Sequence, residues 1–143
     1  MTLNEVQNQI IEEFCQFDEW LDRYEYLIEL GKDLEIIDTK KKTPENLIQG
    51  CQSRVWLDCE ASEEGLLSFK ADSDAIITKG IIALLIRVFN NRNAQEIINA
   101  ELYFIDKTGL QANLSPTRAN GLVAMIKQIK FYAIAYSAKK QQL

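Results

Sequence analysis

Three cysteines and the absence of histidine define the chemistry that this 143-residue chain can support. Without histidine, the chain can build neither a Ser–His–Asp triad nor a Cys–His pair, and it has no imidazole ligand for a metal ion. Cys15, Cys51 and Cys59 are separated by 36 and 8 residues, so they contain no CxxC pair for a zinc knuckle or a dithiol redox motif. The glycine patterns of phosphate-binding loops are absent as well.

Cys51 differs from the other two cysteines in its sequence context. It follows Gly50 in "LIQGCQSRVW" (47–56), where a short polar break is flanked by apolar residues. Glycine permits a tight turn, and a thiol on a turn can reach another molecule. Cys15 falls on or near the apolar face of a predicted helix, and Cys59 falls within a predicted strand. We therefore expect these two thiols to be packing residues.

We expect no metal site and no cofactor, because the cysteines are too far apart to share one ion. Cys51 and Cys59 lie eight residues apart along a largely extended segment, which separates them by about 20–25 Å at about 3.3 Å per residue. Thiolates that share a metal lie within a few ångströms of it. Ser53 and Ser115 are weaker nucleophile candidates, because no histidine can act as their base.

Length, composition and charge are typical of one soluble globular domain that spans residues 1–143. Hydrophobic residues make up 47% and charged residues 26% of the chain. The net charge of −5 argues against a nucleic-acid partner, and we interpret the basic run 40–42 as a solvated loop. No segment has the length and hydrophobicity to cross a bilayer, and residues 1–14 lack the pattern of a signal peptide. We therefore expect a cytoplasmic protein with no membrane partner.

Helical periodicity and capping signals predict five helices, one of them the buried centre of the domain. Thr2 begins a capping-box signature, and Ser115–Pro116 is a start signal for the last helix. We expect Gly31 to cap the end of the second helix and Asp72 or Ser73 to cap the start of the central one. The predicted helices cover residues 3–17, 19–30, 74–89, 93–99 and 116–136.

The middle of the chain predicts an antiparallel meander. Residues 46–49, 54–60 and 66–72 have strand character and are joined by short turns. This arrangement places Cys51 at the first hairpin tip and directs Cys59 to the buried face of the second strand. The predicted fold class is α+β, with helices that cover a small three-stranded antiparallel sheet.

Four segments together resemble the SufE-like proteins, which are cysteine desulfuration proteins or sulfur acceptors of Fe–S cluster assembly. The match runs through nearly the whole chain in the family's order, and its core is GCQSxVW. The four segments are "YEYLIELGKDL" (24–34), "NLIQGCQSRVWL" (46–57), "DSDAIITKGIIALLI" (72–86) and "LSPTRANGLVAMIKQIK" (114–130).

The resemblance implies a SufE/IscU-like fold and a role for one cysteine. Cys51 corresponds to the family's essential residue, which accepts sulfur as a persulfide from a pyridoxal-phosphate cysteine desulfurase of the SufS or CsdA type and stimulates that enzyme. The sulfur then passes to a scaffold of the SufBCD type. No stand-alone activity is expected, and a homodimer is left open. Arg118 lies in the family's SPxRxxG stretch and is a candidate to support the Cys51 loop or partner docking.

The residues themselves agree with sulfur transfer but leave two other classes open. Transfer needs one thiolate and no histidine, metal or second cysteine. Arg54 and Arg118 are the candidate cations that would favour the thiolate, and Ile48 and Val55 are candidates to shelter the loaded sulfur. A thiol reductant with a sulfenic acid at Cys51 is disfavoured, because no resolving cysteine is in place. A pure interaction module stays open until Cys51 is mutated.

Overall fold

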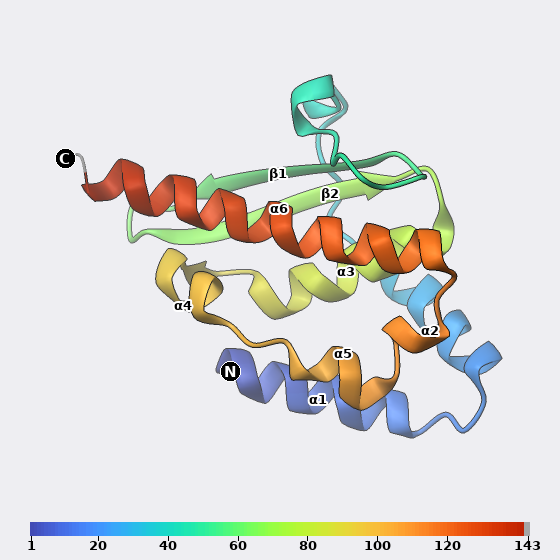
Figure 1. Ribbon diagram of the computed structural model, residues 1–143. Helices are drawn as coiled ribbons and strands as arrows, with labels where there is room; N and C mark the ends of the chain where they lie inside the picture. Colours follow the sequence, from blue (N-terminus) through green and yellow to red (C-terminus); the bar gives the residue numbers. More distant parts are fainter. Residues whose placement is uncertain (142–143) are drawn as a thin grey trace.

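The computed structural model describes residues 1–141, and an α+β fold connects helices and strands along this part of the chain (Figure 1). Short 3-10 turns, η1 to η3, join some of the longer elements. In chain order the elements are α1 (Leu3–Cys15), α2 (Trp20–Lys32), η1 (Thr39–Lys41), η2 (Pro44–Asn46), β1 (Val55–Ala61), β2 (Leu66–Ser73), α3 (Ile76–Phe89), β3 (Arg92–Asn93), α4 (Ala94–Asn99), α5 (Tyr103–Thr108), η3 (Gln111–Asn113) and α6 (Pro116–Gln141).

The sheet is antiparallel with the strand order β1-β2-β3, which confirms a three-stranded sheet but changes one of its members. The predicted strand 46–49 is wrong. Pro44 starts a 3-10 turn there, and pairing with β1 is limited to a bridge between Leu47 and Trp56. Proline fixes its φ and lacks an N–H group, which favours a turn over a ladder at this point. The third strand is the two-residue β3, which lies beside the start of β2.

One face of the sheet is buried beneath helices. Alternate side chains of β1 and β2 form this face, and they are Val55, Leu57, Cys59, Leu67, Phe69 and Ala71. Helix α6 runs along the sheet, as Figure 1 shows, and two of its tyrosines bond to β1. Tyr132 donates to the carbonyl oxygen of Leu57 at 3.1 Å, and Tyr136 donates to that of Cys59 at 2.9 Å. These bonds fix the position of α6 relative to the strand that follows Cys51.

Helix α3 is the buried central helix that the sequence predicts, and it crosses α2 at a pair of glycines. A Cβ atom on Gly80 would lie 2.2 Å from the carbonyl oxygen of Leu27, so the close crossing requires glycine there. The expectation that Gly31 caps α2 is wrong, because the helix continues to Lys32 and Gly31 faces Gly80 inside the crossing. The cap expected before α3 is also misplaced, because its N-cap is Ala75, which has no side-chain cap.

The N-terminal helix confirms its capping box but not the burial of its cysteine. Thr2 Oγ1 accepts from the Glu5 N–H at 3.1 Å, and the Glu5 carboxylate accepts from the Thr2 N–H at 3.2 Å. Phe14 is fully buried, as its helical spacing indicates, whereas Cys15 is exposed. Successive helix residues point about 100° apart, so the neighbour of a buried residue can face solvent.

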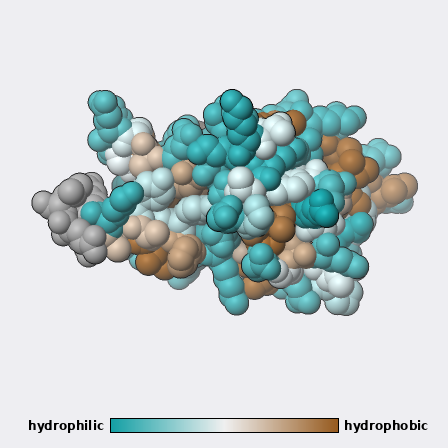
Figure 2. Space-filling model, turned by 90° about the horizontal axis from the view of Figure 1, so that it is seen from above, coloured by the Kyte–Doolittle hydropathy of each residue, from teal (hydrophilic) through white to brown (hydrophobic). Residues whose placement is uncertain are grey.

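The face of the molecule seen in Figure 2 is mainly hydrophilic. Figure 2 shows separate apolar areas between polar side chains, one of them beside the C-terminal end of α6. Exposed large apolar residues lie on several elements, among them Leu21 on α2, Ile76 on α3 and Phe131 on α6. Among the described residues, none of the helices has the length and apolar character to span a membrane.

Candidate functional site

Cys51 lies in a loop whose two ends are held by backbone hydrogen bonds. At the first end, the Ile48 N–H donates to the carbonyl oxygen of Val55 at 2.8 Å. At the second end, the Arg54 N–H donates to the Asp74 carboxylate at 3.0 Å, and the Asp74 N–H donates to the carbonyl oxygen of Arg54 at 3.3 Å. The chain therefore reverses direction around Cys51, as the sequence predicts, although the strand expected before it is absent.

The tip of the loop rests against α6 through small residues. Gly50 has a φ of +93°, which L side chains rarely adopt, and a Cβ atom there would lie 3.3 Å from the Ala124 Cβ. The Cys51 thiol donates a long hydrogen bond of 3.7 Å to the carbonyl oxygen of Gly121. Because Gly121 has no side chain, the thiol lies directly on the backbone of the helix. These two contacts hold the tip without a large apolar anchor.

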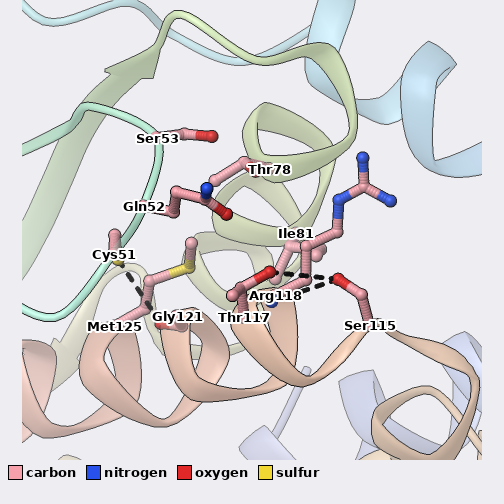
Figure 3. A pocket seen from close by; sticks show the side chains of 10 residues that line it. All are labelled: Cys51, Gln52, Ser53, Thr78, Ile81, Ser115, Thr117, Arg118, Gly121 and Met125. Carbon is pink, nitrogen blue, oxygen red and sulfur yellow. Dashed lines mark hydrogen bonds between the residues drawn. The ribbon is translucent and has the colours of Figure 1, made fainter.

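A cavity of about 330 Å³ opens beside Cys51 between the loop, α3 and the start of α6 (Figure 3). Its lining combines an apolar part near the thiol with hydroxyl groups, one amide and one arginine. The lining residues are Cys51, Gln52, Ser53, Thr78, Ile81, Ser115, Thr117, Arg118, Gly121 and Met125. At the start of α6, Ser115 Oγ accepts from the Arg118 N–H at 3.4 Å and lies 3.3 Å from Thr117 Oγ1. The Ser115–Pro116 start signal is thereby confirmed.

The Cys51 thiol is half-buried, and this burial raises its pKa above the ordinary value for cysteine. The resting side chain is therefore mainly a neutral thiol near neutral pH. Of the two arginines that the sequence brings forward, Arg118 lines the cavity, whereas Arg54 is exposed and does not. Ile48 and Val55 are buried in the core and are not among the lining residues, where Ile81 and Met125 provide the apolar side chains instead.

The other two cysteines do not join this site. Cys59 is 6% exposed on the inner face of β1, which confirms its packing role. Burial, followed by the nearby charges of Asp58 and Glu60, raises the pKa of its thiol to about 12. Cys15 is exposed at the end of α1, and the expectation that it packs in the core is wrong. In the part of the chain that the structure describes, no group of three His, Cys, Asp or Glu side chains is arranged to hold a metal ion.

Sequence reasoning missed most of the cavity. Thr78, Ile81 and Met125 appear in the sequence only as parts of apolar helices, because the cavity forms where α3 and α6 approach the loop. One signal was available: Arg118, Gly121 and Met125 recur at helical spacing and therefore share a face of α6. The sequence does not say that this face meets Cys51.

Comparisons with known proteins agree with the motifs. A family model described as "SufE: Fe-S metabolism associated domain" matches residues 8–133. Two uncharacterised SufE-like proteins match over 127 residues and 86% of this chain: one from Rhizobium meliloti (strain 1021) at 45% identity, covering 91% of that protein, and one from Rhizobium etli at 43%, covering 86%. The fold resembles the solution structure of a hypothetical protein from Thermus thermophilus, with a TM-score of 0.75 and 17% identity over 93% of this chain and 96% of the other.

Proposed function

The chain belongs to the SufE family of Fe–S metabolism associated domains, and from this premise we propose that it carries sulfur on Cys51 for iron–sulfur cluster assembly. Membership of this family indicates a role in Fe–S metabolism. The proposal adds the chemical step, the residue and the partners. The donor is a pyridoxal-phosphate cysteine desulfurase of the SufS or CsdA type, and the receiver is a scaffold of the SufBCD type.

The proposed step is a thiol–persulfide exchange that balances without an oxidant. The Cys51 thiolate attacks the outer sulfur of a persulfide on the donor's cysteine. The bond between the two donor sulfurs breaks, and the donor's thiolate leaves with the electron pair. Cys51 then holds the persulfide, and the donor's cysteine is free for another turnover. Stimulation of the desulfurase follows, because removal of its bound sulfur allows the next cycle to begin.

The observation that carries this proposal is a half-buried thiol at a loop tip with open space beside it. The 330 Å³ cavity next to Cys51 has room for an added sulfur atom and partly shields it from reductants in solution. The tip itself is held by the long bond to Gly121 and the close approach of Gly50 to α6. Little apolar area has to be uncovered when such a tip moves toward a partner. The loop can therefore both present Cys51 and withdraw it.

The test is Cys51→Ser, with Cys15→Ser and Cys59→Ala as matched controls. Each protein is mixed with a cysteine desulfurase and free cysteine, and intact-protein mass spectrometry records the added sulfur. Sulfide release under mild reductant records the stimulation. We expect both signals in wild type and both controls, and neither in Cys51→Ser. Full stimulation by the serine variant would contradict the proposal and identify the protein as an interaction module.

A further inference from the structure

We propose that the cavity beside Cys51 is a binding site for a small persulfide of amino-acid size that carries one carboxylate, and that Cys51 takes sulfur directly from it. This inference rests on the proposed role of Cys51 as a sulfur acceptor, and it adds a free, low-molecular-weight donor to the protein donor. Such a donor can reach the thiol while the loop rests against α6.

The polar end of the cavity suits one negative charge. The side chain of Arg118 lies there (Figure 3), and it makes no ion pair with the residues that the structure describes. The start of the 26-residue helix α6 adds the positive end of a helix dipole and the hydroxyl groups of Ser115 and Thr117. No lining residue is acidic. One arginine matches one carboxylate, which it can bind through two parallel hydrogen bonds.

Thr78 on α3 adds a further polar group to the cavity, opposite the start of α6. This side chain lines the cavity and is only 6% exposed, yet its hydroxyl has no hydrogen-bond partner among the described residues. The polar side-chain atoms that are completely closed off from solvent in the described part of the protein all have partners. The Thr78 hydroxyl is therefore open toward the cavity. A hydroxyl that is open toward a cavity can donate a hydrogen bond to a ligand bound there, or accept one from it.

The other end of the cavity suits sulfur. The Cys51 thiol lies there with Ile81 and Met125, and Gly121 leaves the space next to the sulfur free of a side chain. The volume of about 330 Å³ is at the lower end of the range for small-molecule sites. The cavity thus has a polar end for a carboxylate and an apolar end, with a nucleophile, for a sulfane sulfur.

The proposed reaction balances without an added oxidant or reductant. The Cys51 thiolate attacks the outer sulfur of the small persulfide, and a new S–S bond forms. The original S–S bond breaks, and the small thiolate leaves with the electron pair. It takes up the proton that Cys51 has lost, so one thiol and one persulfide are consumed and one of each is produced.

The experiment compares two persulfide donors on the full chain: cysteine persulfide, which has a carboxylate, and 2-hydroxyethyl persulfide, which does not. Reactions are stopped with an alkylating agent, and intact mass gives the rate of sulfur loading on Cys51. In wild type we expect loading to be about tenfold faster from cysteine persulfide, the effect of one charge-assisted contact. The ratio of the two rates is the readout, because changes in the reactivity of Cys51 cancel in it.

Variants locate the recognition. Arg118→Gln and Thr78→Val should lower the ratio to about one, whereas Thr78→Ser should keep it and Arg118→Lys should keep part of it. Arg118 is exposed, so its variants decide the question even if Thr78→Val does not fold. Equal rates in wild type, or a ratio that both variants retain, would overturn the proposal. Neither of these two outcomes bears on whether the desulfurase loads sulfur onto Cys51. Conversely, a desulfurase that fails to load Cys51 leaves the ratio of the rates from the two small persulfides unchanged.

Discussion

At the scale of residues, three cysteines with the same chemistry lie in three environments, and their accessibility should rank their reactivity. Cys15 is exposed, Cys51 is half-buried and Cys59 is buried with a strongly raised pKa. In the native protein, iodoacetamide should therefore alkylate Cys15 first, Cys51 more slowly, and Cys59 only on unfolding. Peptide mass spectrometry over a time course measures the three rates. Alkylation of native Cys59 at the rate of Cys15 would show that the β1 face opens in solution.

The same residues show which parts of the site the sequence can predict. The alternation of β1 correctly places Cys59 on the buried face, and the polar break correctly places Cys51 on a chain reversal. Cys15 was misplaced because a residue next to a buried helix position can lie on either edge of the apolar face. Thr78 could not be assigned, because its role depends on two helices and a loop that meet only in the folded chain.

At the scale of elements, predictions succeeded for strand alternation and for the side-chain caps of α1 and α6, but failed for the caps of α2 and α3. Strands β1 and β2, the capping box of α1 and the start of α6 agree with expectation to within about two residues. The prediction of a strand at 46–49 was wrong for two reasons. A short apolar segment alone does not specify strand pairing, and Pro44 starts a 3-10 turn just before it. The prediction that Gly31 caps α2 was wrong because a glycine near a helix end can allow close packing of two helices instead of capping one.

The crossing of α2 and α3 leads to a prediction about two glycines. Gly80→Ala should destabilise the protein by about 1–3 kcal/mol or more through overpacking, because its Cβ would lie 2.2 Å from the Leu27 carbonyl oxygen. Gly121→Ala is the matched control: its Cβ would lie 3.5 Å from the Cys51 sulfur, an ordinary contact, and alanine favours a helix. Urea denaturation measures both changes. Equal stability of the two variants would contradict the close crossing.

At the scale of the whole molecule, Asp72 connects three parts of the chain. Its carboxylate on β2 accepts from Lys42, which follows η1, at 2.5 Å, and lies 3.3 Å from the Lys79 ammonium on α3. Lys42 also lies over the ring of Trp56 on β1, with 5.1 Å between the ammonium and the ring centroid. The end of the basic run 40–42 is therefore a structural contact rather than a solvated loop. It fixes the segment before Cys51 to the sheet.

This connection predicts how stability depends on pH. Burial by itself raises the pKa of Asp72, but hydrogen bonds from Lys42, the Ser73 N–H and Lys79 outweigh it and hold the pKa below the ordinary value. A carboxyl group with a lowered folded-state pKa stabilises the protein above its unfolded-state pKa, about 3.9, and this contribution disappears as the pH falls through the folded-state value. Asp72 should therefore stabilise the fold at neutral pH and contribute nothing in strong acid.

The test is Asp72→Asn, which keeps the shape of the side chain but removes its charge. We expect a loss of about 1.5–3 kcal/mol at pH 7, the scale of a hydrogen bond to a charged group. The difference from wild type should shrink as the pH falls below about 4, because Asp72 then binds a proton in the unfolded state, and it should vanish once the pH passes the lowered folded-state pKa. Urea denaturation over a pH series measures it. Asp18→Asn is the control, because Asp18 is exposed and makes no hydrogen bond or ion pair with residues 1–139, whose side chains the structure describes. A gap between Asp72→Asn and wild type that stays constant down to pH 2 would show that the loss comes from packing and not from the charge.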